Sequence, residues 1–466
     1  MTLFHKIKSL HFIGIGGSGM SGIAEVLLNL KYIITGSDLR ETEITRRLEK
    51  LGARIFIGHS AGNVGDTDVV VVSSAVKSDN IEVVTAAHKG IPIIPRAEML
   101  AELMRMKFGI AVGGTHGKSS TTSLVGQILS SCGLDPTIIV GGKVTNLGSG
   151  IRMGTSEYLV AEADEFDRSF LKLMPTIAVV TTLEAEHMEC YTDMDDLRGA
   201  FVEFMNKVPF YGAVVLCLDE TSLQDLLPEV DRRVITYGLS TQSDLRATRI
   251  HFEENRSRFT VNSRGQSFGE VEVGLVGLHN VKNTLAAIAV GLELGLDFEC
   301  IREGLATFDG VHRRFELVGD CCGVIIVDDF GHHPTEIRVT LQGAKLGYDR
   351  PIVAVFQPHL YSRTRDFAGE FGQAFLHSDV LIVTEIYPSR EDPIPGVTGE
   401  LVARAARDYG HRHVHYVSKK EDVPEKLREV VRAGDMVMTF GAGDVYEIGR
   451  DFLKLLQEKG LRKDNK

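Results

Sequence analysis

A lysine behind closely spaced glycines is the first feature of the sequence that could do chemistry. The segment AVGGTHGKSSTTSL contains, in order, Gly113, Gly114, Gly117, Lys118 and Ser119. Such a turn points backbone N–H groups at phosphate oxygens, its lysine reaches the β- and γ-phosphates, and its hydroxyl can bind Mg²⁺. The usual spacing asks for a further glycine where Val112 stands. Because the shorter spacing keeps every chemical part, we predict a triphosphate-binding loop; the alternative is a capped helix with a solvated lysine.

Acidic residues follow this loop at the ends of two later apolar segments. The first group, in AEADEFD, consists of Glu162, Asp164, Glu165 and Asp167. The second group, in TTLEAEHME, consists of Glu184, Glu186 and His187. Acids that end a strand beside a phosphate loop commonly complete a Mg²⁺ site. We therefore interpret both groups as functional; a solvated charge run and a structural histidine are the alternatives.

A second glycine turn lies near the start of the chain. The segment GIGGSG runs from Gly14 to Gly19, between an apolar segment and a helical pattern, and Asp38 ends the next apolar segment. Glycines at the N-terminus of a helix let backbone N–H groups face an anion, and an acid near the position of Asp38 commonly binds a ribose. The pattern predicts a dinucleotide or a nucleotide diphosphate as ligand, with a plain tight turn as the alternative.

Four later segments also carry polar residues that could bind a ligand. GLHNVKNT contains His279, Asn280 and Asn283. GVHRRFE contains His312, Arg313 and Arg314. VDDFGHHPTE and FQPHLYSRTRD contain Asp328, Asp329, His332, His333, His359, Arg363 and Arg365. Amides can contact a base or cap a helix, an arginine can bind phosphates, and open α/β sheets bind ligands at strand ends.

The elements that must position these residues alternate between apolar runs and helical patterns. The first hundred residues hold the strand-like runs LHFIGIGG, YIITGSD, ARIFIG, DVVVVSSA and IPIIP. Uninterrupted apolar runs suit parallel strands that are covered on both faces. Met20, Ile23, Ala24, Leu27 and Leu28 have the spacing of one helix face. A domain boundary is expected in the segment that contains Pro92, Pro95 and residues 96–107.

Two further α/β units follow. The second contains FGIAVGG, EYLVAEAD, TIAVVTTLEAEH and AVVLCLDE, and residues 234–273 predict antiparallel strands at its edge. The third begins near Phe315 and contains GVIIVDDF, PIVAVFQP, DVLIVTEIY and DMVMTFGAG. We predict an α/β fold of three domains: a Rossmann-like N-terminal domain (1–106), a central P-loop-type ATPase domain with a mostly parallel sheet (107–313) and a Rossmann-like C-terminal domain (314–466).

Composition limits the class of protein. A chain of 466 residues is too long for one core, and 43% hydrophobic with 24% charged residues is typical of a soluble globular protein. A net charge of -12 argues against nucleic acid or a membrane surface as the main partner. No apolar run predicts a membrane span or a secretory signal. The six cysteines lack metal or redox spacing, so we predict buried reduced thiols in a cytoplasmic protein.

These segments, in this order, resemble the Mur ligase family. The resemblance is carried by HFIGIGGSGMSGIAEVL, GTHGKSSTT, EADEFDRSF, EAEHM, HNVKN, RRFE, DDFGHHPTE, FQPH, PIPGVTG and GAGD. They extend from about residue 11 to about residue 444, which is nearly the whole chain. Each is modest alone, and their order and spacing together are specific. The shortened phosphate loop is the pattern of that family.

The resemblance implies an ATP- and Mg²⁺-dependent ligase. ATP would phosphorylate the lactyl carboxylate of UDP-N-acetylmuramate, and the amine of L-alanine would attack the acyl phosphate, in peptidoglycan precursor synthesis. No nucleic-acid partner and no membrane insertion are expected, and the protein would be a monomer or a homodimer. Because Arg314 and Asp329 lie outside the domain that carries Lys118, we also expect domain closure around the substrates.

The resemblance also implies roles for single residues. The catalytic residues would be Lys118, Glu162, His187, Asn283 and Arg314, and the metal ligands Ser119, Glu162 and His187. The ATP site would use Gly114, Thr115, His116, Gly117, Lys118, Ser119, Ser120, His279, Asn280, Arg314 and Asp329. The UDP-sugar site would use Gly14, Gly16, Gly17, Ser18, Gly19, Met20, Asp38, Ser74 and His187. The amino-acid site would use His332, His333, His359 and Arg363.

The sequence departs from the family pattern at four places. Ser119 and Ser120 replace two threonines, Thr182 and Glu186 replace an asparagine and an aspartate, Phe330 replaces tyrosine and Leu360 replaces arginine. A sibling ligase that attaches an intact peptide would share most motifs. A nicotinamide-dependent dehydrogenase would explain only Gly14–Gly19 and Asp38. A nucleotide-gated binding protein would leave the C-terminal cluster without a role.

Overall fold

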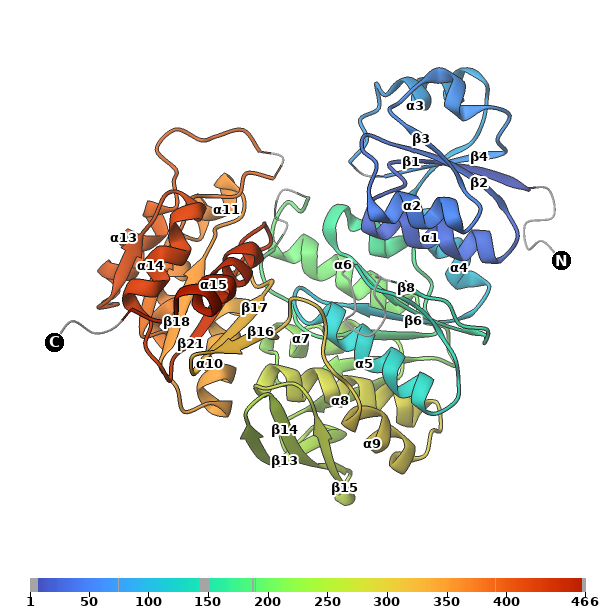
Figure 1. Cartoon of the computed structure of the whole chain (residues 1–466). Helices are drawn as coiled ribbons and strands as arrows, with labels where there is room; N and C mark the ends of the chain where they lie inside the picture. Colours follow the sequence, from blue (N-terminus) through green and yellow to red (C-terminus); the bar gives the residue numbers. More distant parts are fainter. Residues whose placement is uncertain are drawn as a thin grey trace. The chain divides into compact units, whose positions relative to one another are not determined.

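The chain forms three separate sheets that belong to two compact units (Figure 1). The structure is a computed structural model that describes residues 7–73, 75–141, 151–186, 188, 190–389 and 391–462. The first unit takes in most of the chain up to residue 247, with 261–269 and 282–305. The second takes in 248–260, 270–281 and the chain from 306 onward. The three sheets, built mostly from parallel strands that alternate with helices, are those of the predicted three-domain α/β fold.

The N-terminal sheet has five parallel strands in the order β3-β2-β1-β4-β5. The strands are β1 (Ser9–Ile13), β2 (Ile33–Asp38), β3 (Arg54–Ile57), β4 (Val69–Val72) and β5 (Ile93–Pro95). The helices are α1 (Ser18–Asn29), α2 (Glu43–Lys50), α3 (Ile81–His88) and α4 (Arg96–Arg105). The predicted stripe of α1 is apolar as expected, with Met20, Ile23, Ala24 and Leu27 buried. The segment that was expected to hold the boundary between the first two domains, residues 96–107, contains the helix α4.

The central sheet has ten strands in the order β15-β14-β13-β12-β11-β10-β6-β9-β7-β8. They are β6 (Phe108–Gly113), β7 (Thr137–Ile139), β8 (Ile151–Arg152), β9 (Tyr158–Glu162), β10 (Ile177–Val180), β11 (Ala213–Cys217), β12 (Val234–Gly238), β13 (Leu245–Glu253), β14 (Arg256–Ser263) and β15 (Gln266–Val273). The helices are α5 (Lys118–Ser131), α6 (Met194–Asn206), α7 (Thr221–Gln224), α8 (Leu278–Glu293) and α9 (Phe298–Ala306). Strand β6 lies between β9 and β10, so the carboxyl ends of three parallel strands meet.

The prediction of antiparallel strands over residues 234–273 is wrong for its first part. Strand β12 pairs in parallel with β11, and β13 begins in parallel with β12. An alternating sequence with turn residues predicts a strand but not whether its neighbour in the sheet is parallel or antiparallel. That orientation depends on how the chain connects the two strands. The two-residue links of β13 to β14 and of β14 to β15 are those of hairpins, and these strands do end the sheet.

The C-terminal sheet has six strands in the order β16-β17-β21-β18-β19-β20. They are β16 (Glu316–Cys321), β17 (Val324–Asp329), β18 (Ile352–Phe356), β19 (Val380–Val383), β20 (Val414–Tyr416) and β21 (Met436–Phe440). The helices are α10 (Pro334–Gly347), α11 (Tyr361–Asp366), α12 (Ala368–Ala374), α13 (Glu400–Asp408), α14 (Val423–Val430) and α15 (Tyr446–Lys459). Among the described strands of this sheet, only β16 runs antiparallel to its neighbour, and the sequence did not predict that strand.

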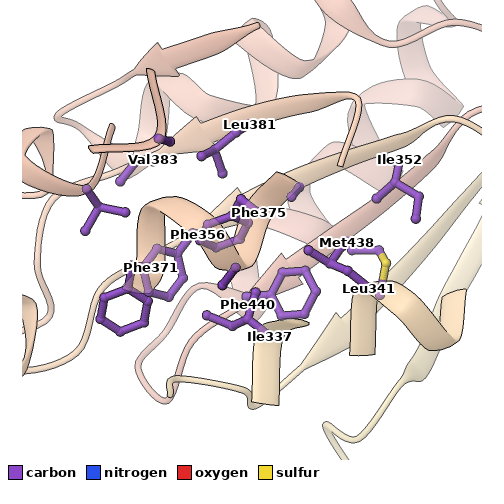
Figure 2. Packing of buried hydrophobic residues seen from close by; sticks show 14 of the residues in the cluster. Ile337, Leu341, Ile352, Phe356, Phe371, Phe375, Leu381, Val383, Met438 and Phe440 are labelled. Atoms are coloured by element: carbon purple, nitrogen blue, oxygen red, sulfur yellow. The ribbon is translucent and has the colours of Figure 1, made fainter. Parts of the chain in front are cut away.

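Alternate residues of these strands enter two cores, one on each face of the C-terminal sheet. Figure 2 shows the first, where Phe356 and Phe440 pack with Phe371 and Phe375 of the adjoining helical segment. The second contains apolar residues of α14 and α15 against the opposite face. The continuous apolar strands of this sheet are therefore covered on both faces.

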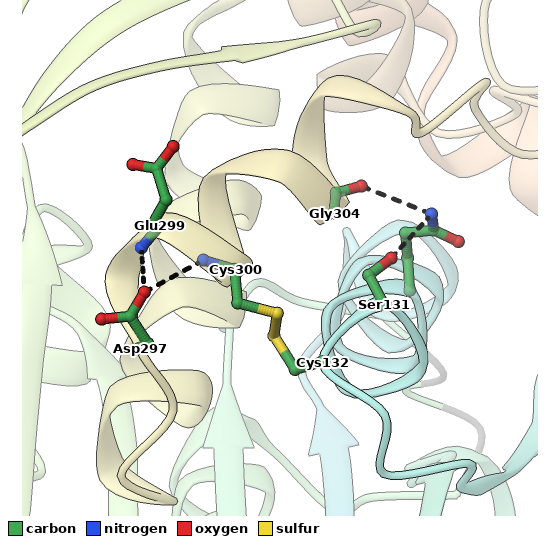
Figure 3. Close-up of a disulfide and its surroundings, with 7 residues drawn as sticks. Ser131, Cys132, Asp297, Glu299, Cys300 and Gly304 are labelled. Carbon is green, nitrogen blue, oxygen red and sulfur yellow. Dashed lines mark hydrogen bonds between the residues drawn. A yellow bond between two sulfur atoms is a disulfide. The ribbon is translucent and has the colours of Figure 1, made fainter.

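The prediction that all six cysteines are buried reduced thiols is wrong. Cys132 and Cys300 form a disulfide between the end of α5 and α9 (Figure 3). Their Cα atoms lie 5.6 Å apart although 168 residues separate them in sequence. Cys322 is exposed, and only Cys217 of the free thiols is buried. Spacing along the chain reveals local metal motifs but not pairs that the fold brings together.

No helix in the described ranges is long and apolar enough to cross a membrane.

Candidate active site

The predicted phosphate loop joins β6 to α5 and needs glycine at two positions. Gly114 and Gly117 have φ of 125° and 82°, in the left-handed region. A Cβ on Gly114 would lie 2.2 Å from Oγ1 of Thr181, and one on Gly117 would lie 2.6 Å from Oδ1 of Asn283. Helix α5 begins at Lys118, and the first N–H groups of a helix lack partners within it. The loop therefore presents donors in the way that anion binding requires.

Thr182, at the end of β10, braces this loop. Its carbonyl accepts from N–H of Thr115 at 3.0 Å, and its Oγ1 accepts from N–H of His116 at 2.8 Å. The hydroxyls of Thr115 and Thr182 lie 2.9 Å apart. The departure from the family pattern at Thr182 thus keeps a side chain that can hold the loop.

Lys118 is paired with Glu165, a contact that sequence reasoning missed. Its Nζ lies 2.7 Å from Oε2 and 2.9 Å from Oε1 of Glu165, whose side chain is fully buried. Burial opposes the lysine charge, but the carboxylates of Glu165 and Asp164 outweigh it and raise the pKa of Lys118. The loop lysine is therefore held cationic beside the α5 N-terminus.

Glu162 and Ser119 form the predicted metal corner. Glu162 pairs in register with Val112, so its side chain leaves β9 next to the phosphate loop. Burial raises the pKa of Glu162, and Ser119 donates a hydrogen bond to it. Its Oε1 is buried and has no hydrogen-bond partner among the described residues. A buried, unsatisfied carboxylate oxygen beside a hydroxyl is a donor set that fits Mg²⁺.

His116 and Asn283 also lie against the loop. Ring nitrogens of His116 lie 3.5 Å from Glu184 and 3.9 Å from Glu186. Asn283, from α8, is 7% exposed and packs against Gly117. Ser120 is buried. The first unit therefore brings together the predicted residues of the loop with Glu162 and Asn283.

Three predicted residues lie wholly or partly outside the described part of the chain. His187 and Ser74 are not described, and nothing is said of the side chain of Ser18. Their predicted roles in metal and UDP-sugar binding stay predictions.

The N-terminal glycine turn lies between β1 and α1. The N–H groups of Gly14 and Ile15 donate to the carbonyl of Ser37 at 2.9 and 3.0 Å. Asp38 Oδ2 accepts from N–H of Gly16 at 2.8 Å. The acid that was predicted to bind a ribose thus contacts the turn itself.

The remaining residues of this predicted site lie around the start of α1. Met20 is buried and Gly17 is exposed. A Cβ on Gly19 would lie 2.9 Å from Nη1 of Arg96, a guanidinium that sequence reasoning did not single out. Arg96 is the first residue of α4, and only its place in space reveals it.

The two neighbouring arginines Arg313 and Arg314 have different contacts in the C-terminal unit. Arg313 donates from Nε to Asp328 at 2.8 Å and from its other nitrogens to the carbonyls of Gly443 and Gly441 at 3.0 and 2.6 Å. Arg314 Nη1 lies 3.4 Å from Oε1 of Glu336. Arg313 is therefore held by the fold, whereas Arg314 contacts Glu336 and the ring of Phe330, and its ligand role stays a prediction.

Asp329 is nearly buried at the end of β17. Its oxygens accept from N–H of Phe315 at 2.9 Å and of Gly331 at 2.8 Å. Burial raises the pKa of Asp329 to about 6, against the lowering effects of Arg314 and the two N–H groups. These bonds fix the carboxylate beside Arg314.

The predicted amino-acid residues gather in the C-terminal unit. The rings of His332 and His359 meet edge to face at 5.6 Å, and His359 stacks on Tyr387 at 6.0 Å. Burial and the charge of Arg363 lower the pKa of His359 to about 4, so the ring is neutral at pH 7. His333 caps α10, because its Nδ1 accepts from N–H of Thr335.

Glu336 organises this group, and sequence reasoning missed it. It accepts from N–H of His332 at 3.0 Å and of His333 at 3.3 Å, and it contacts Arg314. The capping-box spacing from His333 to Glu336 was a signal that could have found it.

His279 and Asn280 lie at the start of α8. Asn280 donates from Nδ2 to the carbonyl of Val276 at 2.9 Å and is 6% exposed. A Cβ on Gly277 would lie 2.8 Å from the ring of His279. One N–H of the Asn280 side-chain amide is thus engaged in a hydrogen bond to the backbone just before α8.

Three sheets with flanking helices, and a predicted phosphate loop at the carboxyl end of β6 in the central sheet, define a three-domain α/β protein of the phosphate-loop class. Three family models match the chain: "Mur ligase family, catalytic domain" at residues 9–108, "Mur ligase middle domain" at 112–291 and "Mur ligase, glutamate ligase domain" at 313–443. The chain belongs to the Mur ligase family.

Single relatives agree with this assignment. The chain is 53% identical to a UDP-N-acetylmuramate–L-alanine ligase of Syntrophotalea carbinolica, over 98% of this chain and all of that protein. It is 30% identical to the crystal structure of a UDP-N-acetylmuramate–alanine ligase from Thermotoga maritima, with a TM-score of 0.80 over 97% and 99% of the two chains. It is 26% identical to a murein peptide ligase from Psychrobacter arcticus, with a TM-score of 0.70 over 98% and 99%.

Proposed function

We propose that the protein joins L-alanine to the lactyl carboxylate of UDP-N-acetylmuramate, with ATP as phosphoryl donor and an acyl phosphate as intermediate, in peptidoglycan precursor synthesis. The single observation that carries this proposal is the full-length identity of 53% with a ligase of that name. The phosphate loop with Lys118, Ser119 and Glu162 supports it, because ATP-driven ligation needs these groups. A nicotinamide-dependent dehydrogenase would leave all three without a role.

The residues of the loop hold and orient the nucleotide. Lys118 would neutralise the β- and γ-phosphates, and the loop N–H groups would fix the phosphate chain. Arg314 and Asp329 would bind the nucleotide from the C-terminal domain, with Asn280 and His279 near the base. Phosphoryl transfer depends mainly on such positioning and charge neutralisation.

Ser119 and Glu162 would hold Mg²⁺, with His187 serving a second ion. The ion supplies charge neutralisation at the transferred phosphoryl group. The unsatisfied Oε1 of Glu162 supports this assignment. Asn283, packed on Gly117, would face the reacting centre.

The other substrates would use the outer domains. The turn at Gly14–Gly19, with Met20, Asp38 and Ser74, would bind the UDP moiety. His332, His333, His359 and Arg363 would form the amino-acid pocket, where the guanidinium of Arg363 is a natural partner for the alanine carboxylate. The neutral ring of His359 suits a pocket that must accept a methyl group.

Three coarser expectations belong to the same proposal. We keep the domain boundaries after residues 106 and 313, supported by the breaks between the three sheets. We keep a cytoplasmic location because ATP is the co-substrate. We also keep a monomer or a homodimer as the oligomeric state.

The test is phosphate release from ATP and Mg²⁺ in the presence of UDP-N-acetylmuramate. L-Alanine, glycine, L-serine and a wall tripeptide are added in parallel. Release that requires the nucleotide sugar and is fastest with L-alanine supports the proposal. Release with the tripeptide alone would move the protein to the peptide-ligase sibling, and no release with any acceptor would refute both.

A further inference from the structure

We propose that Tyr191 and Arg168 are positioning residues of the ATP site, because they hold the segment that aims Glu165 at Lys118. The inference rests on the proposed function, since it matters only if Lys118 binds nucleotide phosphates. Neither residue belongs to the loop or to the predicted metal corner. Their effect would pass through Glu165.

The first step is the contact between Glu165 and Lys118. Both carboxylate oxygens of Glu165 accept from one ammonium, at 2.7 and 2.9 Å. A lysine side chain has four flexible methylenes, so a buried carboxylate that takes two of its hydrogen bonds fixes its direction. The position of Glu165 therefore decides where the charge of Lys118 lies.

The second step is the backbone that follows Glu165. Asp167 and Arg168 have φ of 55° and 60°, so two successive residues other than glycine are left-handed. Such a conformation is unfavourable for a residue with a side chain, and it persists only where neighbours hold it. Downstream, the buried ring of Phe170 packs 5.1 Å from Phe201.

The third step is the clamp on this segment. The hydroxyl of Tyr191 donates to the carbonyl of Glu165 at 2.6 Å, and Tyr191 is 5% exposed. The guanidinium of Arg168 lies over the Tyr191 ring, 5.0 Å from its centroid. Arg168 also donates two hydrogen bonds to the carboxylate of Asp196, which lies in the first turn of α6. The N–H of Asp196 in turn donates to Asp193, the N-cap of that helix. The segment is thus tied to a helix outside the loop.

The clamp predicts a selective defect when it is weakened. Without the Tyr191 hydroxyl the carbonyl of Glu165 loses its shorter hydrogen bond and keeps that from N–H of Arg168 at 3.1 Å, so the Glu165 carboxylate can shift away from Lys118. The nucleotide phosphates would then be bound less well. Tyr191 and Arg168 contact Glu165 and Asp196, which belong neither to the Gly14–Gly19 turn nor to the C-terminal pocket, so binding of the other substrates should be unaffected.

The experiment compares Tyr191→Phe and Arg168→Gln with matched controls. Tyr237→Phe removes the hydroxyl of a tyrosine in β12 of the same unit, which is 1% exposed and hydrogen-bonds Cys217. Arg233→Gln removes an arginine of the same unit that also binds a carboxylate, that of Glu293, through two nitrogens. Steady-state phosphate release gives kcat and KM for each substrate, and thermal unfolding gives each midpoint.

We expect Tyr191→Phe and Arg168→Gln to raise KM for ATP about tenfold, as one lost hydrogen bond of about 1.4 kcal/mol would. KM for UDP-N-acetylmuramate and L-alanine should stay within about twofold of wild type. The unfolding midpoints should match those of the controls, which should keep wild-type KM for ATP. Arg168→Lys should restore part of the ATP affinity because it keeps the charge at Asp196.

Two results would overturn the inference. One is a Tyr191→Phe enzyme indistinguishable from Tyr237→Phe. The other is an equal rise of all three KM values together with a lower midpoint, which a purely structural role would give. If the wild type releases no phosphate, the proposed function fails instead. Calorimetric titration of the same variants with Mg-ATP then decides the inference by itself.

Discussion

The guanidinium of Arg313 donates from Nε to Oδ2 of Asp328 at 2.8 Å, while its neighbour Arg314 contacts Glu336 at 3.4 Å. Arg313 also closes on two backbone carbonyls and stacks on the rings of Phe330 and Tyr446. Two adjacent arginines thus have different tasks. Arg313 joins segments of the C-terminal domain, and Arg314 is the arginine that we propose contacts the nucleotide.

Arg313→Gln and Arg314→Gln should therefore fail in different ways. Removing Arg313 leaves the nearly buried carboxylate of Asp328 without its cation and should destabilise the C-terminal domain by about 3–5 kcal/mol. Removing Arg314 should leave the free energy of unfolding within about 1 kcal/mol and lower kcat by about 100-fold or more. Urea unfolding and phosphate release measure the two effects. Equal loss of stability in both variants would contradict this division.

Glu82 of the N-terminal domain should make stability depend on pH in the acid range. Its buried carboxylate accepts from Ser37, Ser60 and Asn63 and faces the rings of His11 and His59. Burial opposes the charge, but these partners together lower the pKa of Glu82 to about 2 from 4.5. A lowered acid pKa adds stability that is present above pH 4.5 and is lost as pH falls toward 2.

Glu82→Gln tests this relation. The variant should be less stable than wild type by about 3 kcal/mol at pH 7, because the donors that surround the carboxylate lose their charged acceptor. The difference should shrink as pH falls from about 4.5 to about 2. Urea unfolding at a series of pH values from 7 to 3 measures it. A difference that stays constant over this range would show that the carboxylate charge is not the cause.

The disulfide should stabilise the first unit. It closes a loop of 168 residues, and removing such a bridge typically costs about 2–4 kcal/mol. Cys132→Ser, or treatment with dithiothreitol, should lower the unfolding midpoint, whereas Cys190→Ser should not. Thiol titration of the denatured protein should give four free thiols before reduction, those of Cys190, Cys217, Cys321 and Cys322. Six thiols without reductant would refute the bridge.

Gly117→Ala should strongly reduce ATP use because a Cβ there would collide with Asn283, and Gly133 serves as a control that has the same backbone conformation without that contact. Gly117 and Gly133 flank the same helix with φ of 82° and 79°. A Cβ on Gly133 meets nothing within 4 Å, whereas one on Gly117 would lie 2.6 Å from Asn283 Oδ1. Gly133→Ala should cost about 1–2 kcal/mol of stability and keep its activity.

Gly117→Ala carries the same backbone penalty and also displaces the loop or Asn283. A displacement of about 1 Å at a reacting centre can cost 100-fold in rate, so phosphate release should fall at least that far. The comparison uses initial rates at saturating substrates and unfolding midpoints of both variants. Similar activity of the two variants would show that the close contact between residue 117 and Asn283 does not control the rate.

Most helices and strands could be predicted from the sequence because glycine spacing and apolar periodicity act over a few residues. The glycines before Lys118 predicted the turn from β6 into α5, and apolar runs such as VVVV of β4 predicted buried parallel strands. Antiparallel strands over the whole of 234–273 were a wrong prediction, since the direction of β12 depends on its neighbour. Strand β16 was missed because it is polar and lies at an edge.

The sequence by itself determined the family, the order of three α/β sheets and the residue types at the phosphate loop, because periodicity and glycine spacing act over a few residues. Only the tertiary structure decided that Lys118 pairs with Glu165, that Arg313 pairs with Asp328, and that Cys132 meets Cys300. These contacts join residues that lie 15 to 168 positions apart. Their formation depends on how whole strands and helices pack, which no short segment specifies.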